Sequence, residues 1–266
     1  MMIGTILTIS CMKTIINPGM DEQPVLSAKP DLPATDSIQK SDSLPEKYIY
    51  LTIDDAPFNG SEYIDSVIFS AKIKASIFMV GSPINGSSKF ERYHKMLKKN
   101  PYIELYNHSY SHANHKYASY YKSPEQVVDD FERNRSEFNL FTRIARLPGR
   151  NLWQVSDRTK NYKQTGAEAA ALLAEKGYKI FGWDIEWKYD SQNYSPLQTI
   201  DELIEEIDSS YHTSDTFTPN HVVLLMHDQM FAKRNTENDL AELINKLKSA
   251  GYTFEYLRSY PDIAEQ

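Results

Sequence analysis

The sequence has a single cysteine, Cys11, among its 266 residues. One thiol cannot form an internal disulfide, and it cannot supply the several thiolates of a cysteine-based metal site. Basic residues are also outnumbered, with 29 Lys and Arg against 36 Asp and Glu and a formal net charge of −7. No basic cluster relieves this balance, so the composition argues against a nucleic-acid-binding surface.

Long apolar runs are missing as well, since no segment approaches the roughly twenty apolar residues that cross a bilayer. Residues 2–10 form a short apolar run that ends directly before Cys11 and resembles the signal and lipobox of a bacterial lipoprotein. A signal peptide should carry Lys or Arg ahead of this run, and none is present. A start codon placed too late would explain that, and a buried N-terminal strand is the alternative. We expect an exported lipoprotein, anchored to a membrane or in the cell envelope through Cys11.

Three segments are expected along the chain: a signal-like lead over residues 1–16, a disordered tether over 17–46, and one catalytic domain over 47–266. The tether is rich in Pro, Ser, Asp and Lys and has no apolar periodicity, which is typical of a flexible linker. The chain as a whole contains 41% hydrophobic residues. The third segment is therefore long enough and apolar enough for a core of its own.

Beyond residue 47, strand-like and helix-like patterns alternate. Strands are expected over residues 48–53, 74–81, 178–183, 221–226 and 252–257, and helices over 124–138, 167–176, 199–209 and 236–250. Ser123 and Gln126 predict a capping box at the first of these helices, with Pro124 in its first position. Strands alternating with helices of about ten to fifteen residues are typical of a parallel sheet or barrel. In such barrels the functional residues gather at the carboxyl ends of the strands.

Asp54 and Asp55 stand side by side at the end of the first apolar run, and His108 and His112 follow the expected site of a later one. Adjacent carboxylates repel unless a cation neutralises them. Histidines four residues apart can lie on one face of a helical turn. Singly, such pairs are more often turns, helix caps or surface residues. Together they favour an open metal site with one Asp and two His ligands, which leaves the other Asp as a base.

These residues belong to a longer pattern that resembles the polysaccharide deacetylase family, the carbohydrate esterases with a nodulation-protein-type deacetylase domain, over residues 47–264. The matching segments are Thr52-Ile53-Asp54-Asp55-Ala56-Pro57, Ala75-Ser76-Ile77-Phe78-Met79-Val80-Gly81, His108-Ser109-Tyr110-Ser111-His112, Arg146-Leu147-Pro148 and Leu225-Met226-His227-Asp228. The fourth motif of the family, an acidic residue with a Trp, fits less well. Its counterpart lies within residues 182–187, which contain two acids and two Trp.

The resemblance implies a distorted (β/α) barrel with an incomplete set of parallel strands, forming a single catalytic domain. The implied activity is the removal of acetyl groups from an N-acetylated amino-sugar polysaccharide: peptidoglycan, a chitin-like polymer or an exopolysaccharide. The alternatives are an O-acetyl esterase of the xylan type and a catalytically weak carbohydrate-binding member of the same fold. The polysaccharide is the expected partner of a monomer that contacts a membrane only through Cys11.

The resemblance also implies the roles of the first site residues. Asp55, His108 and His112 would hold a divalent metal, with Zn²⁺ expected first and Co²⁺ or a similar ion able to substitute. Asp54 would be the general base and His227 the general acid. A backbone N–H within residues 56–58 would stabilise the oxyanion.

The remaining roles concern orientation and substrate binding. Arg146 would hold Asp54 ionised and oriented, and Asp184 or Glu186 would tune Arg146 or His227. Arg150 is expected to contact sugar or, alternatively, to cap the loop that follows it. The predicted substrate contacts are Pro148, Arg150, Trp187 and Leu225.

Overall fold

The computed structural model describes residues 46–233, 238–261 and 263, and these all belong to one compact unit, Leu44–Gln266. The predicted signal, its Cys11 and nearly all of the predicted tether lie outside the described residues. Within the described ranges, no helix is both long enough and apolar enough to cross a membrane.

The strands of this unit form one sheet with the spatial order β6-β5-β7-β4-β3-β2-β1-β9-β8, and β10 pairs with β1. The strands are β1 Lys47–Ala56, β2 Ala75–Met79, β3 Ile103–Asn107, β4 Ile144–Ala145, β5 Leu152–Val155, β6 Arg158–Asn161, β7 Lys179–Ile180, β8 Ile185–Glu186, β9 His221–His227 and β10 Tyr252–Phe254. All pairs are parallel except those of β5 with β6 and β7. On one edge of β1, β10 pairs with its first residues and β2 with its last.

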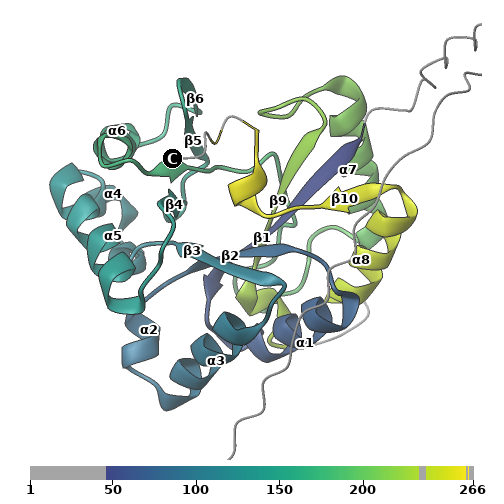
Figure 1. The fold of residues 1–266 in the computed structure, drawn as a ribbon, viewed down its shortest axis with the longest axis horizontal. Coiled ribbons are helices and arrows are strands. Elements are labelled where there is room, and N and C mark those ends of the chain that lie inside the picture. Colours follow the sequence, from purple (N-terminus) through teal and green to yellow (C-terminus); the bar gives the residue numbers. More distant parts are fainter. Residues whose placement is uncertain (1–45, 234–237, 262, 264–266) are drawn as a thin grey trace, which may run out of the picture. The chain divides into compact units, whose positions relative to one another are not determined.

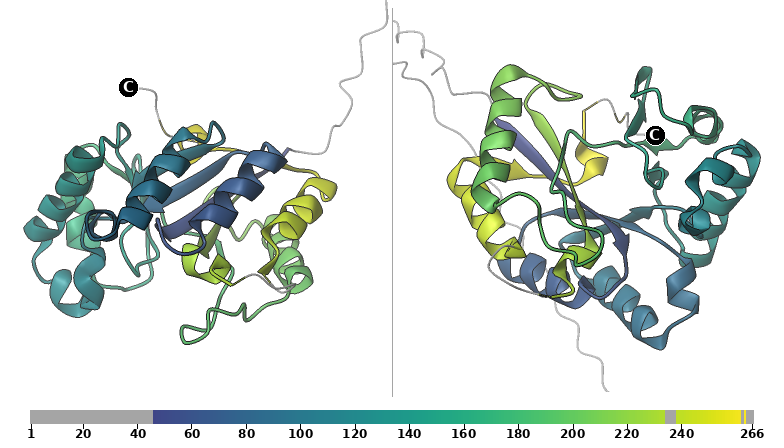
Figure 2. Two further views of the ribbon diagram at one scale, coloured as in Figure 1. Left: turned by 90° about the horizontal axis from the view of Figure 1, so that it is seen from below. Right: turned by 180° about the vertical axis from the view of Figure 1, so that it is seen from behind.

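Helices lie outside the strands, as Figures 1 and 2 show. They are α1 Ser61–Ala71, α2 Ser82–Asn85, α3 Ser88–Lys99, α4 Tyr117–Tyr120, α5 Pro124–Phe138, α6 Ala167–Glu175, α7 Ile200–Thr213 and α8 Leu240–Ser249, with short 3₁₀ helices η1 His112–His115, η2 Asp228–Phe231 and η4 Leu257–Ser259. The curled, mostly parallel sheet with helices around it confirms the predicted distorted (β/α) barrel with an incomplete set of parallel strands.

The predicted elements are present with shifted ends. Helix α7 continues to Thr213, past the expected end at 209, and β7 covers only two residues of the strand expected over 178–183. Helix α5 begins where predicted, but the Ser123 side chain accepts no capping hydrogen bond, so the capping box predicted there is wrong. A capping box forms instead at the start of α7, between Thr199 and Glu202.

Aromatic side chains fill the inside of the barrel. Tyr50 of β1, Phe78 of β2 and Tyr106 of β3 share a buried cluster with Trp153, whose ring stacks on Phe217 with centroids 4.3 Å apart. The outward faces of the strands pack against the helices in a separate, larger apolar cluster. Because side chains fill the interior of the barrel, a polar site can form only at the strand ends.

Candidate active site

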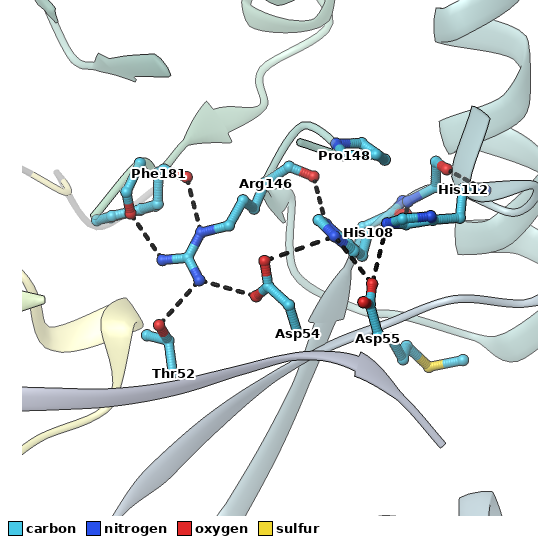
Figure 3. Close-up of polar contacts among 12 residues, drawn as sticks. Thr52, Asp54, Asp55, His108, His112, Arg146, Pro148 and Phe181 are labelled. Carbon is cyan, nitrogen blue, oxygen red and sulfur yellow. Dashed lines mark hydrogen bonds and ion pairs between the residues drawn. The ribbon is translucent and has the colours of Figure 1, made fainter. Parts of the chain in front are cut away.

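Both carboxylates at the end of β1 face the same polar cluster, although neighbouring strand residues normally point to opposite faces. The pairing of β1 with β2 shifts register between Asp54 and Ala56, and Asp55 has a φ of 67°. This bulge breaks the alternation, and Asp adopts such a left-handed backbone more readily than most residues. Oδ2 of Asp54 and Oδ1 of Asp55 therefore each lie 3.5 Å from Nε2 of His108 (Figure 3).

The two histidines are brought together by an irregular turn. His108 follows β3 and His112 begins η1, and φ is positive at Ser109 (66°) and His112 (49°). Buried Asn107 holds the turn, because its Oδ1 accepts the Ser109 N–H at 3.0 Å and its amide donates to the Phe131 carbonyl at 2.8 Å. The ring centroids are 5.1 Å apart. The two histidines do not share a helical turn, so that expectation is wrong, but their rings lie close together as expected.

Asp55, His108 and His112 form a cluster with metal-ligand geometry, since one potential ligand atom from each lies within 4.8 Å of the others. Oδ1 of Asp55 is 2.9 Å from Nε2 of His112, is buried, and has no well-aligned hydrogen-bond donor. Nδ1 of His108 lies 2.9 Å from the Arg146 carbonyl, which can only accept, so Nδ1 carries the proton and Nε2 is free to ligate.

The electrostatics of the cluster suit a cation. The side chains of His108 and Asp55 are 2% and 15% exposed, and that of His112 is 14% exposed. Burial lowers the pKa of His108, which favours the neutral imidazole that a metal requires. Burial acts to raise the pKa of Asp55, but His112 and His108 lower it well below its usual value. An ionised carboxylate with two imidazoles fits Zn²⁺ or a similar divalent ion.

Arg146 is fully buried and ties Asp54 to the barrel wall. Its Nη1 donates to Oδ1 of Asp54 and to Oγ1 of Thr52, each at 2.8 Å. Its Nε and Nη2 donate to the carbonyls of Phe181 (3.2 Å) and Gly182 (2.6 Å), as Figure 3 shows. A buried ion pair is stable only when its remaining donors are satisfied in this way. Arg146 therefore makes the contact with Asp54 that its predicted role, holding this carboxylate ionised and oriented, requires.

His227 closes β9 directly opposite Asp54 in the β1–β9 register. Paired positions on neighbouring strands direct their side chains to the same face of the sheet, so the predicted acid and base share one side. The ring of His227 packs against that of Tyr189 with centroids 5.0 Å apart. Its Nδ1 is buried and has no hydrogen-bond partner among the described residues.

Asp184 is a buried anchor for the backbone beside β9. Its carboxylate accepts the N–H groups of Phe217 at 2.7 Å and Val223 at 2.8 Å. Burial raises its pKa to about 6, and these two hydrogen bonds act in the opposite direction. Within the described part of the chain, its carboxylate bonds to neither Arg146 nor His227. The catalytic role expected for Asp184 stays a prediction.

Glu186 is the alternative acid, and it lies in β8, which is separated from β1 by β9. Burial lowers the pKa of Arg146, and the carboxylates of Asp54, Glu186 and Asp184 oppose that effect in this order of strength. Glu186 therefore acts on the guanidinium more strongly than Asp184 does, although its carboxylate makes no hydrogen bond to Arg146 in the described structure.

The acidic residue after β9 anchors the loop that follows β1. Asp228 is buried and accepts the N–H groups of Gly60 (2.7 Å) and Phe58 (3.2 Å) and the Ser61 hydroxyl. A Cβ atom at Gly60 would lie 2.1 Å from the Asp228 carbonyl oxygen, so only glycine fits there. Because the Phe58 N–H already donates to Asp228, it is not the free oxyanion donor that we expected in this loop.

Three of the four residues predicted to contact substrate are buried, and two of them, Trp187 and Leu225, almost completely. Trp187 is 0% exposed and donates its indole N–H to the Gln198 carbonyl at 3.1 Å, and Leu225 is 2% exposed. Substrate stacking on Trp187 and substrate contact at Leu225 therefore disagree with the structure. The apolar residues beside each motif pack into the core, and the sequence pattern did not distinguish that environment from a groove.

Pro148 and Arg150 follow Arg146 along the chain. Pro148 is buried, and its carbonyl accepts the Tyr121 hydroxyl at 2.7 Å. The guanidinium of Arg150 donates to the Thr165 carbonyl at 2.9 Å and to the Thr165 hydroxyl at 2.8 Å. This is the loop-capping alternative for Arg150. Substrate contact by Pro148 or Arg150 stays a prediction.

Sequence reasoning missed four side chains at the site. Thr52 accepts a hydrogen bond from Arg146, and Gln229 donates to Oδ2 of Asp55 at 3.0 Å. Tyr117 and Tyr189 have raised pKa values, first because they are buried and next because they lie near the charge of Asp55. Thr52 lies inside a quoted motif, and its position in β1 would have indicated its contact. The other three have no local sequence pattern that would reveal them.

The protein is thus a distorted (β/α) barrel with an Asp-His-His cluster at the carboxyl ends of its strands. The family model for polysaccharide deacetylase matches residues 41–170. YheN of Bacillus subtilis (strain 168), named as a member of that family, is 27% identical over 242 residues, covering 89% of this chain and 77% of YheN. These two matches support assignment of the chain to the polysaccharide deacetylase family.

Solved structures agree with this assignment at the level of fold. A CE4 esterase from Streptococcus mutans has a TM-score of 0.60 at 24% identity, covering 80% of this chain and 86% of the esterase. The catalytic domain of a peptidoglycan N-acetylglucosamine deacetylase from Eubacterium rectale ATCC 33656 has a TM-score of 0.59 at 24% identity, covering 84% of this chain and 94% of that domain.

Proposed function

We propose that this polysaccharide deacetylase is a metal-dependent hydrolase that removes acetyl groups from an N-acetylated amino-sugar polysaccharide. The observation that carries the proposal is the bulge at Asp55, which turns two consecutive carboxylates toward His108. One carboxylate can then serve as a ligand while the other, held by Arg146, remains available for proton transfer.

The metal would be held by Asp55, His108 and His112, and Zn²⁺ is the ion that this donor set favours. When bound, it would polarise the acetyl carbonyl and lower the pKa of a water molecule. The protein's own part is to fix the tautomer and the direction of the imidazoles. The His108 contact with the Arg146 carbonyl does this for one of them.

Asp54 would take the proton of the attacking water. Its Oδ1 is bonded to Arg146, whereas its Oδ2 faces Nε2 of His108 at the site. His227, paired with Asp54 across β1 and β9, would donate a proton to the departing amine. Base and acid thus belong to adjacent strands, so the sheet fixes their separation.

The substrate class follows from the relatives by analogy. The deacetylase from Eubacterium rectale is named for the N-acetylglucosamine of peptidoglycan, and the Streptococcus mutans relative is named as an esterase. Acetate release from peptidoglycan, chitin oligomers, an N-acetylated exopolysaccharide and acetylated xylan separates the candidates. We expect release from at least one N-acetylated polymer, and release that is slower by roughly 10²- to 10⁴-fold for an Asp54→Asn control.

Other outcomes would change the assignment. Release from xylan alone would identify an O-acetyl esterase. Binding to a polymer without acetate release from any of them would identify a carbohydrate-binding member of the fold. Such polymers lie outside the cytoplasm, which fits the expected export and anchoring through Cys11.

A further inference from the structure

The side chain of Gln229, the second residue of η2, contacts a proposed metal ligand. Its Nε2 donates to Oδ2 of Asp55 at 3.0 Å. Its Oε1 is buried and has no hydrogen-bond partner in the described structure. A buried glutamine with a purely structural role would accept hydrogen bonds at its amide oxygen as well as donate them from its N–H groups. Here the contact with Asp55 is the only hydrogen bond that the Gln229 side chain makes among described residues.

This contact gives the two oxygens of Asp55 different roles. Oδ1 faces Nε2 of His112 and of His108 at 2.9 and 3.5 Å, whereas Oδ2 is held by Gln229. The backbone cannot fix the carboxylate by strand alternation alone, since Asp55 lies in the bulge with a φ of 67°. A neutral donor on Oδ2 therefore sets the rotation of the carboxylate and directs Oδ1 toward the imidazoles.

The element that carries Gln229 is itself fixed to the loop after Asp55. Asp228, its neighbour, accepts the N–H groups of Phe58 and Gly60. The next two residues of η2, Met230 and Phe231, are each 1% exposed. Gln229 is thus held in place before any ligand binds, which lets a single hydrogen bond orient Asp55 at little cost in side-chain entropy.

We propose that Gln229 is a positioning residue for the metal site, orienting the Asp55 carboxylate for a divalent cation; this inference rests on the proposed function. Hydrogen-bond partners of metal ligands typically contribute about 10- to 100-fold in metal affinity. We expect that loss for Gln229→Ala, and the same loss for Gln229→Met, which keeps most of the side-chain volume but has no N–H.

The test measures Zn²⁺ affinity of the full chain by competition with a chromophoric chelator, and the visible absorption of the Co²⁺-loaded protein. Gln126→Ala, an exposed glutamine in α5, is the matched control and should bind like wild type. Thermal melts of the metal-free variants check the fold. Weaker Zn²⁺ binding and shifted Co²⁺ bands in both Gln229 variants, with the control unchanged, support the proposal.

The outcomes separate two failures. If wild type binds one Zn²⁺ per chain and both Gln229 variants bind equally tightly, the positioning role is refuted and the metal site stands. If Gln229→Met binds like wild type while Gln229→Ala does not, packing rather than the hydrogen bond is responsible, and the proposal is again refuted. If wild type binds no metal, the proposed function fails with it.

Discussion

Replacing Arg146 with Met should lower the free energy of unfolding, because it leaves the Asp54 carboxylate buried without a partner. The guanidinium is completely buried and pairs with Asp54 at 2.8 Å, and the Asp54 side chain is 4% exposed. Removing one partner of such a pair costs about 3–5 kcal/mol, because the other charge stays buried without compensation. The carbonyls of Phe181 and Gly182 also lose their donors, which costs about 1–3 kcal/mol for each.

The variant should therefore lose at least about 5 kcal/mol of its free energy of unfolding, a large part of the roughly 5–15 kcal/mol typical of a protein. Adding Asp54→Leu removes the unpaired carboxylate, so the double variant should be more stable than Arg146→Met alone. Urea denaturation of metal-free protein measures both, since a bound ion would add its own stabilisation.

Arg143→Met is the matched control. Its guanidinium pairs with Glu132 at 3.3 Å, but its side chain is 42% exposed, so the change should cost less than about 1 kcal/mol. A loss below about 1 kcal/mol for Arg146→Met, or a double variant less stable than the single one, would refute the reasoning that an uncompensated buried charge dominates.

Three further predictions concern the proposed roles. Asp54→Asn and His227→Ala should keep one metal per chain and lose roughly 10²- to 10⁴-fold in kcat for acetate release; loss of the metal from Asp54→Asn would make Asp54 a ligand. Burial raises the pKa of Asp184 to about 6, so the folded state retains a proton that the unfolded state releases near pH 4. Wild type should therefore lose up to about 3 kcal/mol relative to Asp184→Asn as pH rises from 4 to 7, and a pH-independent difference between their unfolding free energies would contradict this. Cys11→Ser should move the exported chain from the membrane fraction to the soluble one, whereas unprocessed wild-type chain in the cytosol would argue against export.

The sequence predicted those parts of the fold that have strong local patterns. The run ending at Asp54 and the run beginning at His221 became the longest strands, β1 and β9. A strand before His108 was expected only without bounds, because β3 is short, mixes polar with apolar residues, and owes its burial to neighbours in the sheet. Helix α3 was not predicted.

The site was predictable where a motif sets both residue type and spacing, as for Asp55, His108 and His112. It was not predictable where tertiary packing decides. Trp187 is an indole near a motif, and only the fold shows that it is fully buried. Gln229 reaches Asp55 from a different strand end, across 174 residues of sequence, and no local pattern marks such a contact.

The central claim is that Asp55, His108 and His112 hold a divalent ion on which acetate release depends. Titrating Zn²⁺ into chelator-stripped protein while following acetate release from an N-acetylated substrate tests it most directly. We expect no release before Zn²⁺ is added and a rise to a plateau at one ion per chain, with no plateau at that ratio for His112→Ala. Full activity in the stripped, metal-free protein would contradict the account.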